Sequence, residues 1–72
     1  MLWILHRADN TLILRSELVG FTDAVELELF GDSFLRRRWR FLRDVEARRY
    51  ADRLRGRLIA RGFEQRRLSR GA

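Results

Sequence analysis

The chain has 72 residues, enough for one small domain, and it contains no Cys, which excludes disulfide bonds and thiolate metal sites. All 16 basic residues are Arg: residues 1–35 carry two against six acidic residues, a net charge of −4, and residues 36–72 carry fourteen against four, a net charge of +10. The total of +6 and its concentration in the second half predict an acidic partner, either a nucleic acid or an acidic protein surface.

Two apolar segments near the start of the chain predict a β-hairpin. Residues 2–6 and 12–19 are rich in Leu and Ile, and Ala8-Asp9-Asn10-Thr11 lies between them. Asp and Asn accept the left-handed backbone conformations of tight turns, so these four residues predict the connection. The apolar run at residues 1–5 ends at His6 and Arg7, which makes it too short for a signal peptide or a membrane span. We therefore expect a cytoplasmic protein with no membrane partner.

A second hairpin is predicted by alternation on both sides of Gly31-Asp32-Ser33. Residues 25–29 and 34–41 alternate apolar and charged side chains, as a strand with one buried face does. A three-residue turn at 31–33 matches apolar side chains on one face and opposite charges on the other, whereas a two-residue Gly31-Asp32 turn mixes them. The predicted pairs are Leu29 with Leu35, Val25 with Trp39, Glu28 with Arg36, and Glu26 with Arg38, with Arg37 at the margin of the buried face next to Leu27.

Residues 33–43 also fit helical spacing, because Leu35, Trp39 and Leu42 would share one side of a helix capped by Ser33. This alternative stays open at the level of sequence. The match of Glu with Arg across the strands favours the hairpin.

The second half of the chain predicts one helix, from about Val45 to Arg61. Asp44 is a suitable N-cap, and Gly62 followed by Phe63 is typical of a C-terminal glycine cap. An apolar stripe recurs at helical spacing through Ala47, Tyr50, Ala51, Leu54 and Leu58. Residues 64–72 are polar and Arg-rich and predict a disordered tail. The sequence thus predicts an α+β domain at 1–63: an antiparallel four-stranded β-meander with one C-terminal helix packed on one face, in the order β-β-β-β-α.

The predicted helix carries the strongest candidate binding residues. Arg49, Arg53, Arg57 and Arg61 follow one another at spacings of four residues. Each like-charge pair at this spacing destabilises an isolated helix by about 0.2–0.5 kcal/mol, so the row favours an external anion. Arg48 and Arg55 flank the row and join the candidate set. The alternative, a solvated face in an arginine-biased proteome, stays open.

The face of the predicted sheet that the helix leaves uncovered is a second candidate surface. Alternation places Ile4 and Ile13 on this face, and Phe30 and Phe34 at its hairpin end. Several apolar side chains on an uncovered face predict a contact surface, most simply between two copies of this chain or with a larger protein.

From Val25 to Phe63 the chain resembles bacterial WGR domains. The shared features are an alternating strand ending in Leu29-Phe30-Gly31-Asp32, the Arg-rich strand 36–40, and a helix that ends before Gly62-Phe63. In that family, the Trp and Arg of a Trp-Gly-Arg motif lie at a nucleic-acid-binding surface. The resemblance implies that role for Trp39 and Arg40, although this chain has no Gly between them and lacks the glycine-rich loop that usually follows.

Catalytic and metal-binding patterns are weak in this sequence. His6 is the sole His, and neither a Cys nor a pair of carboxylates accompanies it. We expect a protein that is not an enzyme and has no cofactor or metal. The leading hypothesis is a nucleic-acid-binding module that uses the helix arginines. The alternative is a protein-interaction module, such as an accessory subunit or a phage-type inhibitor or adaptor, that binds an acidic protein surface.

Overall fold

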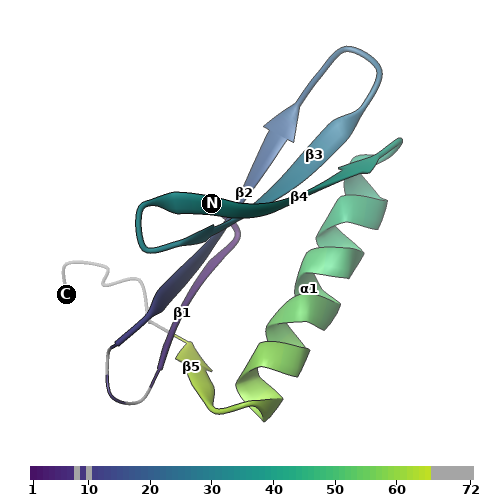
Figure 1. Cartoon of the computed structure of the whole chain (residues 1–72). Helices are drawn as coiled ribbons and strands as arrows, with labels where there is room; N and C mark the ends of the chain where they lie inside the picture. The colour runs from purple at the N-terminus through teal and green to yellow at the C-terminus, as the bar shows by residue number, and fades with distance from the viewer. Residues whose placement is uncertain (8, 10, 66–72) are drawn as a thin grey trace, which may run out of the picture.

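The computed structural model describes residues 1–7, 9 and 11–65 of the chain. The elements in this part of the chain are β1 (Trp3–Arg7), β2 (Ile13–Gly20), β3 (Val25–Gly31), β4 (Phe34–Phe41), α1 (Asp44–Ala60) and β5 (Phe63–Gln65). The strands form one antiparallel sheet in the order β4-β3-β2-β1-β5, and α1 runs along one side of it (Figure 1). The predicted α+β fold, a four-strand meander followed by a helix, is confirmed.

The first hairpin pairs β1 with β2, as predicted. Trp3 lies opposite Ser16, and Leu5 lies opposite Leu14. In the connection, the Asp9 carboxylate accepts hydrogen bonds from the hydroxyl of Thr11 at 2.7 Å and from its amide at 3.1 Å. Both bonds favour the charged carboxylate and hold the pKa of Asp9 below its usual value. The Asp9 carboxylate therefore stabilises this connection by accepting a hydrogen bond from the Thr11 amide, as a backbone carbonyl does in an ordinary turn.

The second hairpin also forms, but its register is two residues away from the predicted one. Gly31 is the last residue of β3 and lies opposite Phe34, so the turn is Asp32-Ser33 rather than the predicted three residues. Further along the ladder, Glu28 faces Arg38 and Glu26 faces Arg40. The predicted pairs Glu28 with Arg36 and Glu26 with Arg38 are wrong, and so are Leu29 with Leu35 and Val25 with Trp39, because Leu29 faces Arg37 and Val25 faces Phe41. From Arg37 to Phe41 the shift is two residues, so these side chains keep their predicted faces. At the tip the shift is one residue, so Leu35 and Phe34 lie on the faces opposite to those predicted.

Arg36 explains this register. Phe30 pairs with Leu35 and Leu29 pairs with Arg37, so Arg36 is the extra residue of a β-bulge in β4. If β4 had no bulge, the two-residue turn would set charged side chains opposite apolar ones along the rest of the hairpin. The Arg36 side chain lies over Gly31, where an added Cβ would meet its Nε at 2.7 Å. A side chain at position 31 would therefore displace the Arg36 side chain from this position. In the turn, Asp32 takes the left-handed conformation, with φ of 56°.

The helix α1 follows β4 after Leu42 and Arg43. Because residues 34–41 form a strand, the alternative helix over 33–43 is excluded. The predicted N-cap is also wrong: Arg43 occupies the cap position with extended backbone and no side-chain cap bond, and Asp44 is the first helical residue. At the other end, Gly62 has φ of 102° and its amide donates to the carbonyl of Ile59. The predicted glycine cap is confirmed there.

The core lies between the sheet and α1. Ala47 and Ala51 are fully buried, and their small side chains let the helix approach the sheet closely. The indole N–H of Trp3 donates to the carbonyl of Ala51 at 3.0 Å, which ties β1 to the second turn of α1. The buried Ser16 hydroxyl accepts a hydrogen bond from the Trp3 amide at 3.2 Å. The buried apolar residues are Trp3, Leu5, Leu14, Ala24, Leu27, Ala47, Ala51 and Phe63.

A fifth strand, β5, was not predicted. After Gly62 the chain turns back beside β1, where Phe63 lies opposite Arg7 and Gln65 lies opposite Leu5 (Figure 1). Glu64 and Gln65 therefore belong to the sheet, and the predicted domain boundary at residue 63 falls inside a strand. The rest of the predicted tail, residues 66–72, lies outside the described residues.

Candidate functional site

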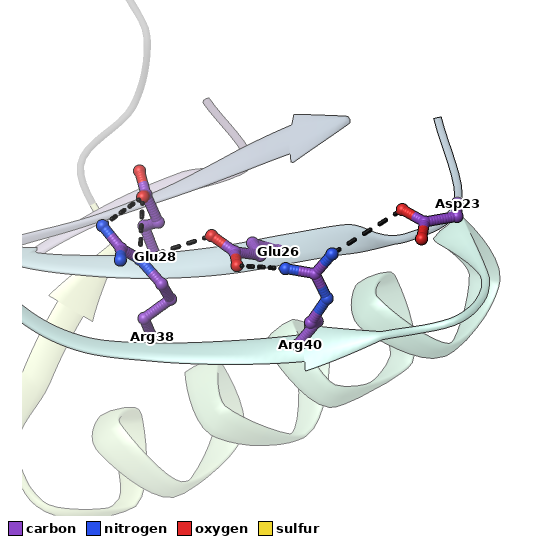
Figure 2. Close-up of polar contacts among 5 residues, drawn as sticks. All are labelled: Asp23, Glu26, Glu28, Arg38 and Arg40. Atoms are coloured by element: carbon purple, nitrogen blue, oxygen red, sulfur yellow. Dashed lines mark hydrogen bonds and ion pairs between the residues drawn. The ribbon is translucent and has the colours of Figure 1, made fainter. Parts of the chain in front are cut away.

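The arginines of β4 that face away from α1 are neutralised by acidic residues of the neighbouring strand. Arg38 lies 3.2 Å from Glu28 and 3.3 Å from Glu26, and Arg40 lies 3.0 Å from Glu26 and 3.7 Å from Asp23. Figure 2 shows the two guanidinium groups reaching from β4 to the carboxylates of β3 and its preceding loop. Arg40, which the family resemblance implied as a nucleic-acid contact, is thus held in a structural ion-pair network.

Two of the predicted helix arginines are also paired. Arg48 forms an ion pair with Asp44, one turn earlier on α1. Arg55 lies 3.1 Å from Asp52 and donates a hydrogen bond to the Gln65 side chain at 2.9 Å. Both arginines lie on the side of α1 that faces β5 and β1, around an open hollow of about 310 Å³. The hollow is lined by Leu2, Trp3, Arg48, Ala51, Asp52, Arg55 and Gln65.

The predicted row on α1 is different. Within residues 1–7, 9 and 11–65, Arg49, Arg53, Arg57 and Arg61 have no carboxylate within ion-pair distance. The side chains at 49, 53, 57 and 61 belong to exposed residues. Because four residues exceed one helical turn of 3.6, the row moves round the helix as it descends. Arg53 and Arg57 lie on the side of α1 that carries the Tyr50 ring.

Aromatic side chains fill the junction between α1 and β4. The ring of Tyr50, on α1, lies 5.1 Å from the ring of Trp39 and 5.6 Å from that of Phe41, both tilted by 47°. The guanidinium carbons of Arg53 and Arg57 each lie 5.9 Å from the centre of the Tyr50 ring. Contacts of this kind contribute about 0.5–1 kcal/mol at exposed positions. Trp39 and Tyr50 are half-buried, which agrees with a packing role for both.

Arg37 joins this junction, and it was absent from the predicted site. It lies opposite Leu29, on the α1 side of β4, and its guanidinium carbon is 5.0 Å from the centre of the Trp39 ring. The sequence placed Arg37 at the margin of the buried face, and the structure confirms that its side chain is exposed. The available signal was the i, i+2 spacing of Arg37 and Trp39, which puts both residues on one face of a strand.

The uncovered face of the sheet carries part of the predicted contact surface. Ile4, Ile13 and Phe30 are half-buried there, and the Arg15 guanidinium lies 4.3 Å from the centre of the Phe30 ring. The bulge sets Leu35, not Phe34, opposite Phe30. Phe34 lies opposite Gly31 and is 69% exposed, so it does not join the other three residues.

Comparisons of the chain with protein-family models, with curated protein sequences and with solved structures gave no match. The resemblance to WGR domains therefore stays a prediction. In the part of the chain that the structure describes, no helix is long and apolar enough to cross a membrane. Nor does that part bring three or more His, Cys, Asp or Glu side chains together at a potential metal site.

Proposed function

We propose that this chain is a non-enzymatic binding module that holds the phosphate backbone of a nucleic acid on the unpaired arginines of α1. One observation carries the proposal: Arg49, Arg53, Arg57 and Arg61 lack carboxylate partners among the described residues, whereas Asp44 and Asp52 of the same helix are already paired with Arg48 and Arg55. Positive charge that the fold leaves unneutralised is available to an acidic ligand.

The length of the row supports a polymeric ligand. Arg49 and Arg61 are twelve residues apart, so the row covers about 18 Å at a rise of 1.5 Å per residue. A DNA strand rises about 3.4 Å per nucleotide along the duplex axis, so the row matches about five nucleotides of one strand. Guanidinium groups also suit phosphates because their N–H donors match the geometry of phosphate oxygens.

The proposal is tested by replacing Arg49, Arg53 and Arg57 with Gln and measuring oligonucleotide binding over a range of salt concentrations. Each neutralised phosphate contributes about −0.9 to the slope of log K against log salt for duplex DNA, or about −0.7 for a single strand. We expect the triple variant to lose about two to three units of slope for duplex DNA. Its fold should persist, because all three side chains are exposed.

The matched control removes three paired arginines: Arg40→Gln, Arg48→Gln and Arg55→Gln. This variant has the same net charge as the triple variant of the row, and we expect it to lose less than half as much slope. Equal losses in the two variants would show that only total charge matters and would contradict the proposed site. A parent protein that binds neither DNA nor RNA at low salt would exclude the function itself.

A second candidate function, binding of an acidic protein, is favoured by the edge of the sheet. Among the described residues, β4 pairs with β3 on one side only, and four of its eight residues are Arg. An edge strand of this kind can accept an extended acidic peptide as an additional strand. Two copies of β4 would bring like charges together, which disfavours pairing of the strand with itself. A parent protein that ignores oligonucleotides but binds polyglutamate would support this candidate.

A further inference from the structure

An aromatic–arginine cluster at the junction of α1 and β4 is the feature that the proposed row does not explain. The cluster consists of the Trp39–Tyr50 ring pair and the three arginines placed against it, Arg37, Arg53 and Arg57. Two of these arginines come from the helix and one from the edge strand. Residues that are well separated in sequence are thus collected around one pair of rings whose centres are 5.1 Å apart.

The two rings are half-buried and pack against neighbouring side chains. Trp39 lies opposite Leu27, which is fully buried. Phe41 packs against Tyr50 from the end of β4. An arginine that rests on such a ring loses less freedom on binding an anion than an arginine that extends into solvent.

The charge of the cluster is uncompensated within the described residues. None of its three arginines forms an ion pair there. Glu46, one turn before Tyr50 on α1, makes no ion pair with any of them. Contact with a ring face uses the plane of a guanidinium group and leaves its N–H donors for other partners. One donor group lies against Trp39 and two lie against Tyr50, along a single ring pair. Because the described chain supplies no acceptor to them, these donors match an anionic ligand that has several oxygens.

We propose that Arg37, Arg53 and Arg57, positioned by Trp39 and Tyr50, form one composite site for a phosphodiester group. This inference rests on the proposed function and extends it: the nucleic-acid strand passes along α1 and enters the junction with β4. The arginines and the rings contact one another, so recognition at this point depends on phosphate charge and not on stacking of bases. Arg37 is therefore a binding residue, and Arg40, on the opposite face of the same strand, is not.

The test compares Arg37→Gln with Arg36→Gln. The two variants remove the same charge from adjacent exposed positions of β4, and neither position is ion-paired among the described residues. Only Arg37 contacts the aromatic pair. Fluorescence anisotropy with a labelled oligo(dT) strand and with a short DNA duplex gives the affinity of each variant as a function of salt. Circular dichroism confirms that both variants fold.

We expect Arg37→Gln to remove one phosphate contact. The slope of log K against log salt should fall by about 0.7 for the single strand or 0.9 for the duplex, and the affinity by about five- to eightfold at roughly 0.1 M salt. Arg36→Gln should change the slope by less than half as much. Equal effects of the two substitutions would overturn the composite site. If the triple variant of the α1 row still loses its slope in that case, the proposed function survives and only the composite site fails.

Tryptophan emission supplies a second readout. Trp3 is 5% exposed and its indole N–H is already bonded to Ala51, so a change in emission on adding oligo(dT) reports on Trp39. We expect this change in the parent protein and in Arg36→Gln, and a clearly smaller change in Arg37→Gln at equal saturation. A parent protein that binds the oligonucleotide with no change in emission would contradict the proposal.

Discussion

The outer face of the β3–β4 hairpin and the outer surface of α1 are both rich in arginine, yet they differ in what surrounds that arginine. On the hairpin, Arg38 and Arg40 lie among carboxylates at 3.0–3.7 Å. On the helix, the row that begins at Arg49 and ends at Arg61 has no such partner within the described residues. The same residue type therefore stabilises the fold in one region and is left available for a ligand in the other.

The number of charges alone therefore does not locate a binding surface. What matters is whether tertiary structure brings an opposite charge within reach. Glu26 and Glu28 are only 13% and 15% exposed at their side chains, and the arginines opposite them compensate charge that lies close to the sheet. On α1, Asp44 and Asp52 neutralise Arg48 and Arg55 on one side of the helix. The arginines of the row on the other side have no acidic partner among the described residues.

The largest change in stability that we predict comes from the paired region. Replacing both Arg38 and Arg40 with Gln removes the cross-strand pairs with Glu28 and Glu26. Such pairs contribute about 0.2–1 kcal/mol each, so we expect the free energy of unfolding to fall by about 0.4–2 kcal/mol. The lower half of this range is favoured because both arginine side chains are more than half exposed. Urea denaturation measures the change.

The control for this variant is Arg36→Gln, on the same strand but outside the ion-pair network. We expect its unfolding free energy to lie within about 0.5 kcal/mol of the parent value. A double variant at positions 38 and 40 that keeps full stability but binds nucleic acid as poorly as the triple variant of the α1 row would reverse the roles assigned to the two regions.

A smaller effect distinguishes two arginines within the row. Arg49→Gln removes one like-charge pair, with Arg53, and takes a positive charge from the N-terminal half of α1. We expect it to stabilise the protein by about 0.2–0.5 kcal/mol. Arg53→Gln relieves two such pairs, with Arg49 and Arg57, but loses the contact with Tyr50, which is similar in size to both pairs together, so we expect almost no net change. Thermal unfolding of the two single variants side by side tests this contrast, and a gain for Arg53→Gln about twice that of Arg49→Gln would show that the Tyr50 contact contributes nothing.

Much of the fold could be predicted because alternation and helical spacing are local properties. Both hairpins, the helix and its C-terminal Gly62 follow from residue patterns within a few positions of one another. The register of the second hairpin could not be predicted in the same way. It depends on Asp32 taking a left-handed conformation and on Arg36 forming a bulge over Gly31. Neither of these features leaves a distinct mark in the sequence.

Two further differences have tertiary causes. The strand β5 forms because Gly62 turns the chain back beside β1, where the ladder extends from Arg7 to Leu5. The strand β5 has only three residues, and two of them, Glu64 and Gln65, are polar, so its sequence alone does not predict a strand. At the start of α1, Asp44 pairs with Arg48 one turn later, and it does this as a helical residue instead of as a cap.

The candidate site was predicted in part. The row on α1 is visible in the sequence because its spacing of four residues is helical. The assignment of Arg40 to the site came from its position after Trp39, and the two-residue shift in register pairs it with Glu26 instead. Arg37 was missed because its contact with Trp39 forms part of the cluster only when Tyr50 of α1 packs beside the same ring. That packing is a tertiary contact, which the local sequence does not predict.

The most direct test of the division between the two regions is NMR observation of the arginine Nε–H signals during titration with oligo(dT). We predict that the signals of Arg49, Arg53, Arg57 and Arg37 shift progressively with added oligonucleotide. The signals of Arg38 and Arg48, whose Nε–H groups already donate to Glu28 and Asp44, should stay in place. Uniform shifts across both groups, or shifts confined to Arg38 and Arg48, would contradict the claim that unpaired arginines form the binding surface.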